Sequence, residues 1–180
     1  MNFYTRKNIN DDNLPKGMWV YSEMSDLEAV KLIPKNLIME AAAQYLLDDI
    51  LASETIFVNK PDAVVKYLRT SLKHKKNESF GMVLLSTSNK ILGIEYLCSG
   101  TIDSAAVYPR NVVEAIISNE LPVNAVVFFH NHPSGQSTPS QADKNITKRL
   151  VAALGLIDVR VLDHIIIGDD TYVFSEHGLI

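Results

Sequence analysis

Apolar and polar residues follow two different rhythms after about residue 55. Short apolar runs rich in β-branched and aromatic residues predict strands, and stretches with apolar residues three or four positions apart predict helices. The predicted strands are 80–85, 91–97, 125–129, 159–162, 165–167 and 172–174. The predicted helices are 61–72, 109–119 and 140–154. Hairpin and crossover connections both occur in this order, so we expect an α/β fold with a mixed β-sheet sandwiched between helices.

The N-terminal part of the chain has a different character. Its beginning is polar and predicts an arm or loop. Ser25 is typical of an N-cap and predicts a short helix that ends before Pro34, and a longer helix is predicted over residues 36–51. We therefore expect an N-terminal arm and helical extension over residues 1–55, followed by one domain over residues 56–180.

Composition limits the class of protein. Apolar residues make up 47% of the 180 residues, which is enough to bury a core, and charged residues make up 21%. A net charge of −4 argues against a protein that mainly coats nucleic acid. Cys98 is the only cysteine, so neither a disulfide within the chain nor a cysteine-based zinc site can form. Because no apolar run approaches a membrane span and the start lacks the apolar segment of a signal peptide, we expect a cytoplasmic protein.

The strongest chemical signal lies where the predicted strand 125–129 ends. His130 and His132 follow it directly, and side chains two positions apart in a strand point the same way. A loop rich in proline, serine and glycine comes next, and Ser140 and Asp143 lie where a helix begins. Three protein ligands that leave one position open are typical of a catalytic zinc site, so His130, His132 and Asp143 are candidate metal ligands.

A purely structural interpretation explains part of this pattern. Ser140 and Asp143 have the spacing of a capping box, in which the serine caps the helix and the acidic residue favours its N-terminus. Helix capping gives no reason for two histidines at the end of the preceding strand, however. The combination therefore favours a metal site over capping alone.

A metal-assisted hydrolase also needs a carboxylate that carries a proton. Spacing alone does not choose among the acidic residues of this region, which are Glu54, Glu78, Glu95, Asp103, Glu114, Glu120, Asp163 and Glu176. Glu78 is the favoured proton carrier because it comes just before an apolar strand, so its carboxylate could lie at the end of that strand. The alternative is a solvated residue that follows the basic run 73–76.

The extended string H-N-H-P-S-G-x-x-x-P-S-x-x-D, from His130 to Asp143, resembles the JAB-type domain of the RadC family of bacterial proteins. That domain belongs with the JAMM (MPN-plus) metalloproteases, which share a fold with the cytidine deaminases. The resemblance covers residues 56–180 and implies that His130, His132 and Asp143 hold one Zn²⁺ per chain. It also implies that Glu78 is the general acid/base and that Ser140 helps to hold the tetrahedral oxyanion.

The resemblance has one departure and leaves alternatives open. Typical RadC proteins carry an N-terminal helix-hairpin-helix region, and residues 1–55 show no such hairpin, so we expect DNA binding to be weak. The first hypothesis is a zinc-dependent hydrolase of amide or isopeptide bonds that acts on an unidentified peptide or protein. The second is a non-catalytic zinc-binding module associated with DNA repair or mobile elements, and the third is a nuclease or phosphoesterase. Deamination is disfavoured, because His132 stands where the deaminases have glutamate and their cysteine pair is missing.

His164 and the basic run 73–76 complete the list of candidates. His164 is interpreted as a satisfied histidine at a strand end, and support for a metal ligand is the alternative. The basic run is interpreted as a solvated helix end, and contact with phosphates is its alternative.

Overall fold

The protein is built on one five-stranded sheet. The computed structural model describes residues 18–21, 31–59, 61–100 and 107–180. The strands are β3 (Ser79–Leu85), β4 (Ile91–Ser99), β5 (Ala125–Asn131), β6 (Arg160–Ile167) and β7 (Thr171–Val173), in the order β4-β3-β5-β6-β7. β5 and β6 run parallel, and the other neighbours are antiparallel. The sheet is therefore mixed, as expected from the sequence.

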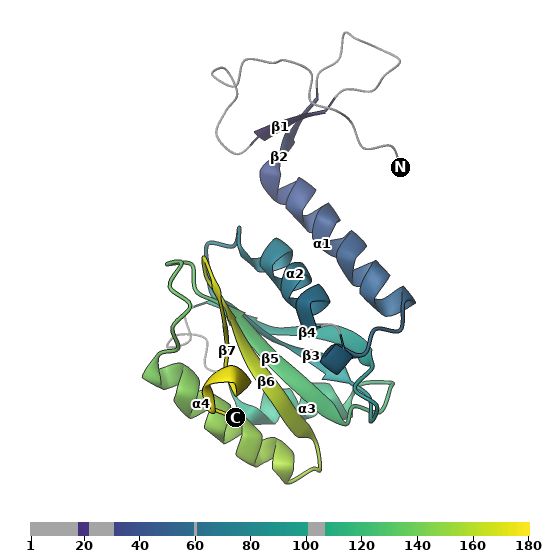
Figure 1. Cartoon of the computed structure of the whole chain (residues 1–180), viewed down its shortest axis with the longest axis vertical. Helices are drawn as coiled ribbons and strands as arrows, with labels where there is room; N and C mark the ends of the chain where they lie inside the picture. The colour runs from purple at the N-terminus through teal and green to yellow at the C-terminus, as the bar shows by residue number, and fades with distance from the viewer. Residues whose placement is uncertain (1–17, 22–30, 60, 101–106) are drawn as a thin grey trace.

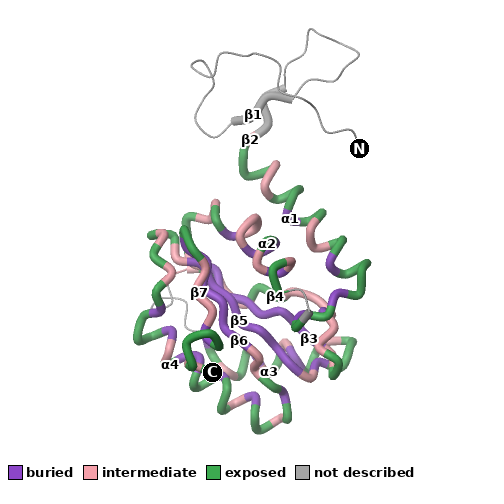
Figure 2. Tube along the Cα trace, in the orientation of Figure 1, coloured by how far each residue is buried: buried purple, intermediate pink, exposed green. Residues whose placement is uncertain are grey.

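Helices cover both faces of this sheet (Figure 1). α1 (Lys35–Ala52) and α2 (Pro61–Leu72) lie on one face, and α3 (Pro109–Ile117) and α4 (Gln141–Gly155) lie on the other. Alternate residues of β5 serve two cores: Val127 and Phe129 pack with α1 and α2, while Val126 and Phe128 pack with α3 and α4. Figure 2 shows β5 buried along its length, and β5 is the middle strand of the sheet.

Two predicted strands, 159–162 and 165–167, form the single strand β6. The polar pair Asp163 and His164 suggested a break in the apolar pattern, but both residues are buried within the strand. Asp163 accepts hydrogen bonds from the backbone and hydroxyl of Ser175, at 3.1 and 2.5 Å, and these contacts satisfy its carboxylate. The chain therefore stays extended through residues that sequence reasoning placed at a strand end.

The N-terminal extension differs from the prediction. β1 (Met18–Tyr21) and β2 (Lys31–Pro34) pair as antiparallel strands, so the helix predicted to end before Pro34 is wrong for residues 31–34. Ser25, its predicted cap, lies outside the described residues. α1 begins at Lys35 as the next helix, and it contributes Ala43 and Ile50 to the core that it shares with α2. None of the helices in the described ranges is long and apolar enough to cross a membrane.

Candidate metal centre

The carboxyl end of β5 brings two imidazoles together. His130 is completely buried, whereas the side chain of His132 is 13% exposed and forms the open side of the group. Their Nε2 atoms lie 3.0 Å apart. His132 continues the sheet because its backbone N–H donates to the carbonyl of Ile167 at 2.9 Å. The alternation of side chains along β5 thus places both rings on the face that α4 covers.

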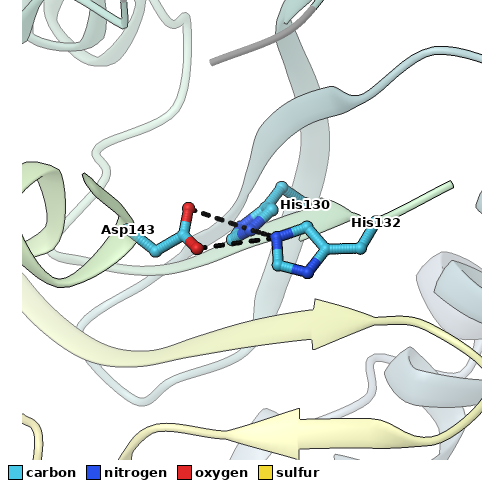
Figure 3. A group of neighbouring side chains, drawn as sticks. All are labelled: His130, His132 and Asp143. Carbon is cyan, nitrogen blue, oxygen red and sulfur yellow. Dashed lines mark hydrogen bonds and ion pairs between the residues drawn. The ribbon is translucent and has the colours of Figure 1, made fainter. Parts of the chain in front are cut away.

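The first turn of α4 supplies the third member of the group (Figure 3). Asp143 is buried, with Oδ1 at 3.3 Å from Nε2 of His130 and Oδ2 at 3.5 Å from Nε2 of His132. A capping box fixes it: Ser140 Oγ accepts from the backbone of Asp143 at 3.1 Å, and Oδ2 accepts from the backbone of Ser140 at 2.7 Å. Asp143 therefore belongs both to the predicted capping box and to the predicted group of metal ligands.

Burial and charge act on these groups in different directions. Burial lowers the pKa of His130, and the nearby Asp143 only partly opposes this effect. The carboxylate of Asp143, beside Nε2, raises the pKa of the more open His132, and burial opposes this effect. Burial by itself would raise the pKa of Asp143, but the adjacent His130 and His132 and the hydrogen bond from Ser140 lower it below its usual range. The group therefore contains a carboxylate that stays ionised beside a neutral, buried imidazole.

The hydrogen bonding of the group fits a bound cation. Nδ1 of His132 lies 2.6 Å from the carbonyl oxygen of Gln136, which can only accept, so Nδ1 carries the hydrogen and neutral His132 has its lone pair on Nε2. Oδ1 of Asp143 is buried and has no hydrogen-bond partner among the described residues. One atom from each of the three side chains lies within 4.8 Å of the others. Two imidazole nitrogens and one carboxylate oxygen could hold a divalent metal ion.

Glu78 immediately precedes β3, and β3 pairs with β5 so that Phe80 lies opposite His130. Burial still lowers the pKa of His130 and Asp143 is the main cause that raises the pKa of His132, but the negative charge of Glu78 makes a smaller contribution in the raising direction at both rings. Asn131, which is buried between the two histidines in sequence, holds the segment on either side of Glu78. Its Oδ1 accepts from the backbone of Ser79 at 2.8 Å, and its Nδ2 donates to the carbonyl of Asn77 at 3.2 Å. Sequence reasoning missed Asn131, because only the fold shows that this amide is buried and that its partners flank Glu78.

The other predicted carboxylates differ in placement. The carboxylate of Asp163 accepts hydrogen bonds from Ser175. Glu95 is exposed on β4, and Asp103 lies outside the described residues. Ser140 is exposed, and its hydroxyl donates to Oδ2 of Asp143 at 2.7 Å. The hydroxyl hydrogen of Ser140 therefore points to the carboxylate, and it would have to turn to reach an oxyanion.

The loop between the two ligand-bearing elements is fixed by a close backbone approach. Gly135 has φ of 87°, a conformation that favours glycine, and its carbonyl accepts from the backbone of Asp169 at 2.7 Å. A Cβ atom on Gly168 would collide with the backbone of Gly135. This contact holds the loop that carries the carbonyl of Gln136 to His132, and so it fixes the orientation of that ring.

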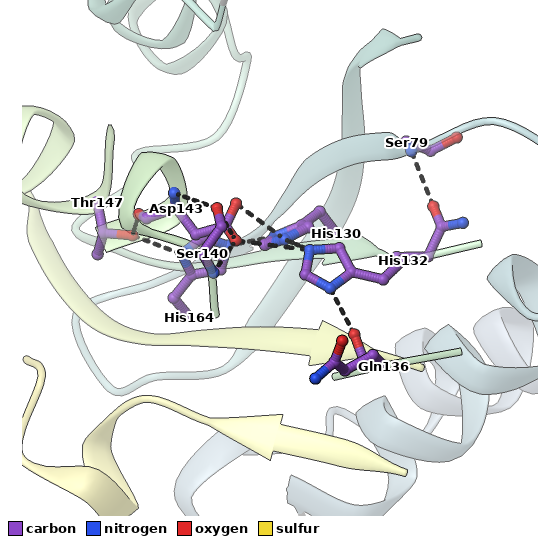
Figure 4. Close-up of polar contacts among 9 residues, drawn as sticks. Ser79, His130, His132, Gln136, Ser140, Asp143, Thr147 and His164 are labelled. Atoms are coloured by element: carbon purple, nitrogen blue, oxygen red, sulfur yellow. Dashed lines mark hydrogen bonds and ion pairs between the residues drawn. The ribbon is translucent and has the colours of Figure 1, made fainter. Parts of the chain in front are cut away.

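Two further residues, His164 and Thr147, lie behind the centre (Figure 4). Sequence reasoning left two alternatives open for His164 and did not single out Thr147. His164 is fully buried and contacts Nδ1 of His130 at 2.8 Å, and burial lowers its pKa well below the usual value. Thr147, one turn after Asp143 in α4, contacts His164 at 2.7 Å. The spacing of four residues from Asp143, which puts both side chains on one helix face, is the signal that could have found Thr147.

The sequence matches a known family over most of its length. The family model for the RadC-like JAB domain matches residues 58–179, a segment that contains β3–β7 and the whole metal centre. A UPF0758 protein of Vibrio cholerae is 43% identical over 154 residues, which cover 86% of the chain and 96% of that relative. UPF0758 proteins of Cellvibrio japonicus and Pseudoalteromonas translucida are 42% and 43% identical, over 84% and 86% of the chain. The matched part spans 66% and 67% of those two relatives, which are longer proteins.

Proposed function

This chain belongs to the family of proteins with a RadC-like JAB domain, and from that membership we propose that it is a zinc-dependent hydrolase of amide or isopeptide bonds. The observation that carries the proposal is the convergence of His130, His132 and Asp143 on one point, next to a second carboxylate, Glu78, at the entry to β3, the strand that pairs with β5. A purely structural cluster has no need of that second carboxylate. The substrate we propose is a peptide or protein.

His130, His132 and Asp143 would hold the ion, and they offer the nitrogen and oxygen donors that zinc accepts. Bound there, zinc would supply Lewis acidity, which polarises a carbonyl group and lowers the pKa of water to about 7. The partial exposure of His132 favours approach of a substrate from its side, because His130 and Asp143 are closed off by the protein.

Glu78 is proposed to move the proton. It would accept a hydrogen from the attacking water and return it to the leaving amine, which is the work of a general base that then acts as an acid. The bridge from Asn131 to the backbone on both sides of Glu78 supports this role, because a proton carrier must be held within hydrogen-bond reach of the reacting atoms. Its backbone is held once more where the amide of Gly100 donates to the carbonyl of Glu78 at 2.8 Å.

Ser140 is proposed to donate a hydrogen bond to the oxyanion. Ser140 is an exposed residue whose hydroxyl contacts Asp143, and rotation about one bond would redirect its hydrogen. A fixed donor of this kind typically contributes about 10²–10³ in rate, and the lower end applies where a cation polarises the same oxygen.

Amide chemistry is preferred to phosphate chemistry. Enzymes that cleave phosphate esters with two metals need ligands for both ions, and the described residues show one three-residue group. Two lysines of the basic run are also engaged: Lys73 lies 3.9 Å from the carboxylate of Asp169, and Lys75 lies over the ring of Tyr96. These contacts support the expectation that duplex DNA is at most a weak partner.

The proposal is tested with purified protein loaded with zinc and a panel of fluorogenic peptides and isopeptide-linked peptides. We expect cleavage by the wild type and none by Glu78→Gln, which retains the size of the side chain but cannot shuttle a proton. Glu95→Gln, an exposed carboxylate on β4, is the matched control and should cleave like the wild type. Equal activity of Glu78→Gln and the wild type would refute the role of Glu78.

A second candidate function is a metal-binding module without catalysis, associated with DNA repair or mobile elements. It is favoured by the hydrogen bond that directs the hydroxyl of Ser140 at Asp143, since a purely structural site would use the serine in this way. If the protein is such a module, the wild type should bind zinc but cleave none of the peptides. The Glu78→Gln variant should then bind zinc with the same affinity and also cleave none.

A further inference from the structure

A chain of three buried hydrogen bonds leads away from the metal centre and returns to it (Figure 4). Nδ1 of His130 lies 2.8 Å from Nε2 of His164, and Nδ1 of His164 lies 2.7 Å from Oγ1 of Thr147. Oγ1 of Thr147 donates to the backbone carbonyl of Asp143 at 2.6 Å. All four residues are at most 1% exposed, so water does not compete for these contacts. The chain thus links two candidate ligands, His130 and Asp143, behind the site.

The direction of this chain is set at the Thr147 end. A hydroxyl group has one hydrogen, and the carbonyl of Asp143 can only accept, so the hydrogen of Thr147 is used there. Toward His164, Oγ1 of Thr147 can therefore only accept. It follows that Nδ1 of His164 carries a hydrogen.

The same reasoning passes through His164 to His130. His164 is fully buried against the rings of Phe80, Phe128 and Phe174, an environment in which an imidazolium is costly, so the ring is neutral and has a single N–H. With its hydrogen on Nδ1, its Nε2 offers a lone pair, and Nδ1 of His130 must be the donor. Neutral His130 then has its lone pair on Nε2, the atom that faces His132 and Asp143.

We infer that Thr147 and His164 are positioning residues that lock His130 in the tautomer able to bind a metal ion. The inference rests on the metal site of the proposed function and adds how its most buried ligand is made ready. Without the lock, a hydrogen on Nε2 of His130 would point into the centre and would have to move before an ion could bind. Loss of a partner that orients a ligand histidine typically weakens metal binding about 10–100-fold.

A matched pair at Thr147 tests the lock. Thr147→Val keeps the shape and removes the hydroxyl, whereas Thr147→Ser keeps the hydroxyl. We expect zinc affinity, measured by competition with a chromophoric chelator, to fall about 10–100-fold in Thr147→Val and to stay near wild type in Thr147→Ser. The absorption spectrum of the Co²⁺-loaded protein should shift in Thr147→Val alone, since a purely structural change elsewhere would leave the ligand geometry as it is.

The tautomer is also measured directly, by ¹⁵N NMR of the histidine rings in metal-free wild type. The lock requires the Nδ1–H form of His130 and of His164, and an Nε2–H form of either ring overturns it. Wild-type zinc affinity in Thr147→Val also overturns it. If Thr147→Val does not fold, His164→Leu and His164→Gln replace it, because glutamine keeps an acceptor for His130 and leucine does not.

Failure of the lock and failure of the proposed function are distinguishable. Should wild-type protein bind no zinc, the proposed function falls, and the NMR measurement on metal-free protein still decides the tautomer. Should it bind zinc but cleave no amide, the two Thr147 variants still decide whether the buried chain prepares the ligand.

Discussion

Zinc should stabilise the folded protein through the carboxylate of Asp143. Because Asp143 also takes part in the capping box of α4, one substitution at Asp143 and one at Ser140 should separate metal binding from helix capping. The carboxylate of Asp143 lies 3.3 and 3.5 Å from two imidazole nitrogens, and its Oδ1 has no hydrogen-bond partner in the described part of the chain. A ligand at one hundred times its dissociation constant stabilises the folded state by about 2.7 kcal/mol. At about 2–4 °C per kcal/mol for a chain of this size, the melting temperature should rise by about 5–11 °C.

Two variants distinguish metal binding from helix capping. Asp143→Asn keeps an oxygen that can accept from the backbone of Ser140 but loses the charged ligand, so the increase on adding zinc should disappear. Ser140→Ala loses the N-cap, worth about 1 kcal/mol, so its melting temperature should fall both with and without zinc. The increase on adding zinc should nevertheless persist in Ser140→Ala.

Differential scanning fluorimetry in a weakly chelating buffer, with and without zinc, measures all three proteins. Circular dichroism at 25 °C confirms that each variant is folded before the comparison. The reasoning is refuted if Asp143→Asn keeps the full wild-type increase, because the carboxylate would then not be a ligand.

Further outcomes follow from the same geometry. In metal-free protein the pKa of His132 is raised above its unfolded value, so His132 stabilises the fold below about pH 6.5 and this contribution is lost as pH rises through the folded pKa. Zinc needs neutral His132, so the zinc-induced increase in melting temperature should shrink as pH falls through the same range, and a pH-independent increase would contradict this. Asn131→Asp should keep zinc while lowering the rate of hydrolysis, because a carboxylate cannot donate to the carbonyl of Asn77; an unchanged rate would show that the bridge is dispensable. Binding to duplex DNA, measured by fluorescence anisotropy, should be weak at physiological salt and fall steeply as salt rises, and nanomolar binding would contradict it.

The cluster could be predicted from sequence because its elements are local. Strand alternation places His130 and His132 on one side, and capping chemistry starts a helix at Ser140 that carries Asp143. Each inference uses residues that are neighbours along the chain. The structure places these side chains within ligand distance of one another, as the pattern indicated.

What sequence reasoning missed depends on contacts between distant segments. The interior of β6 contains Asp163 and His164, and a polar pair there suggests a strand end unless their partners are known. Those partners are Ser175, His130 and Thr147, which come from three other segments. Likewise, β2 is only four residues long, too short for its periodicity to distinguish a strand from the end of a helix.

The spacing of the ligands also bears on the order in which the site is completed during synthesis. All three candidate ligands lie between residues 130 and 143, so closing the loop that joins them has a small entropic cost even in an unfolded chain. The residue that orients His130 is 34 positions further along the chain. A chain that is still being synthesised can therefore bring all three ligands together before β6 exists. The partner that we infer orients His130 reaches it only when β6 docks parallel to β5.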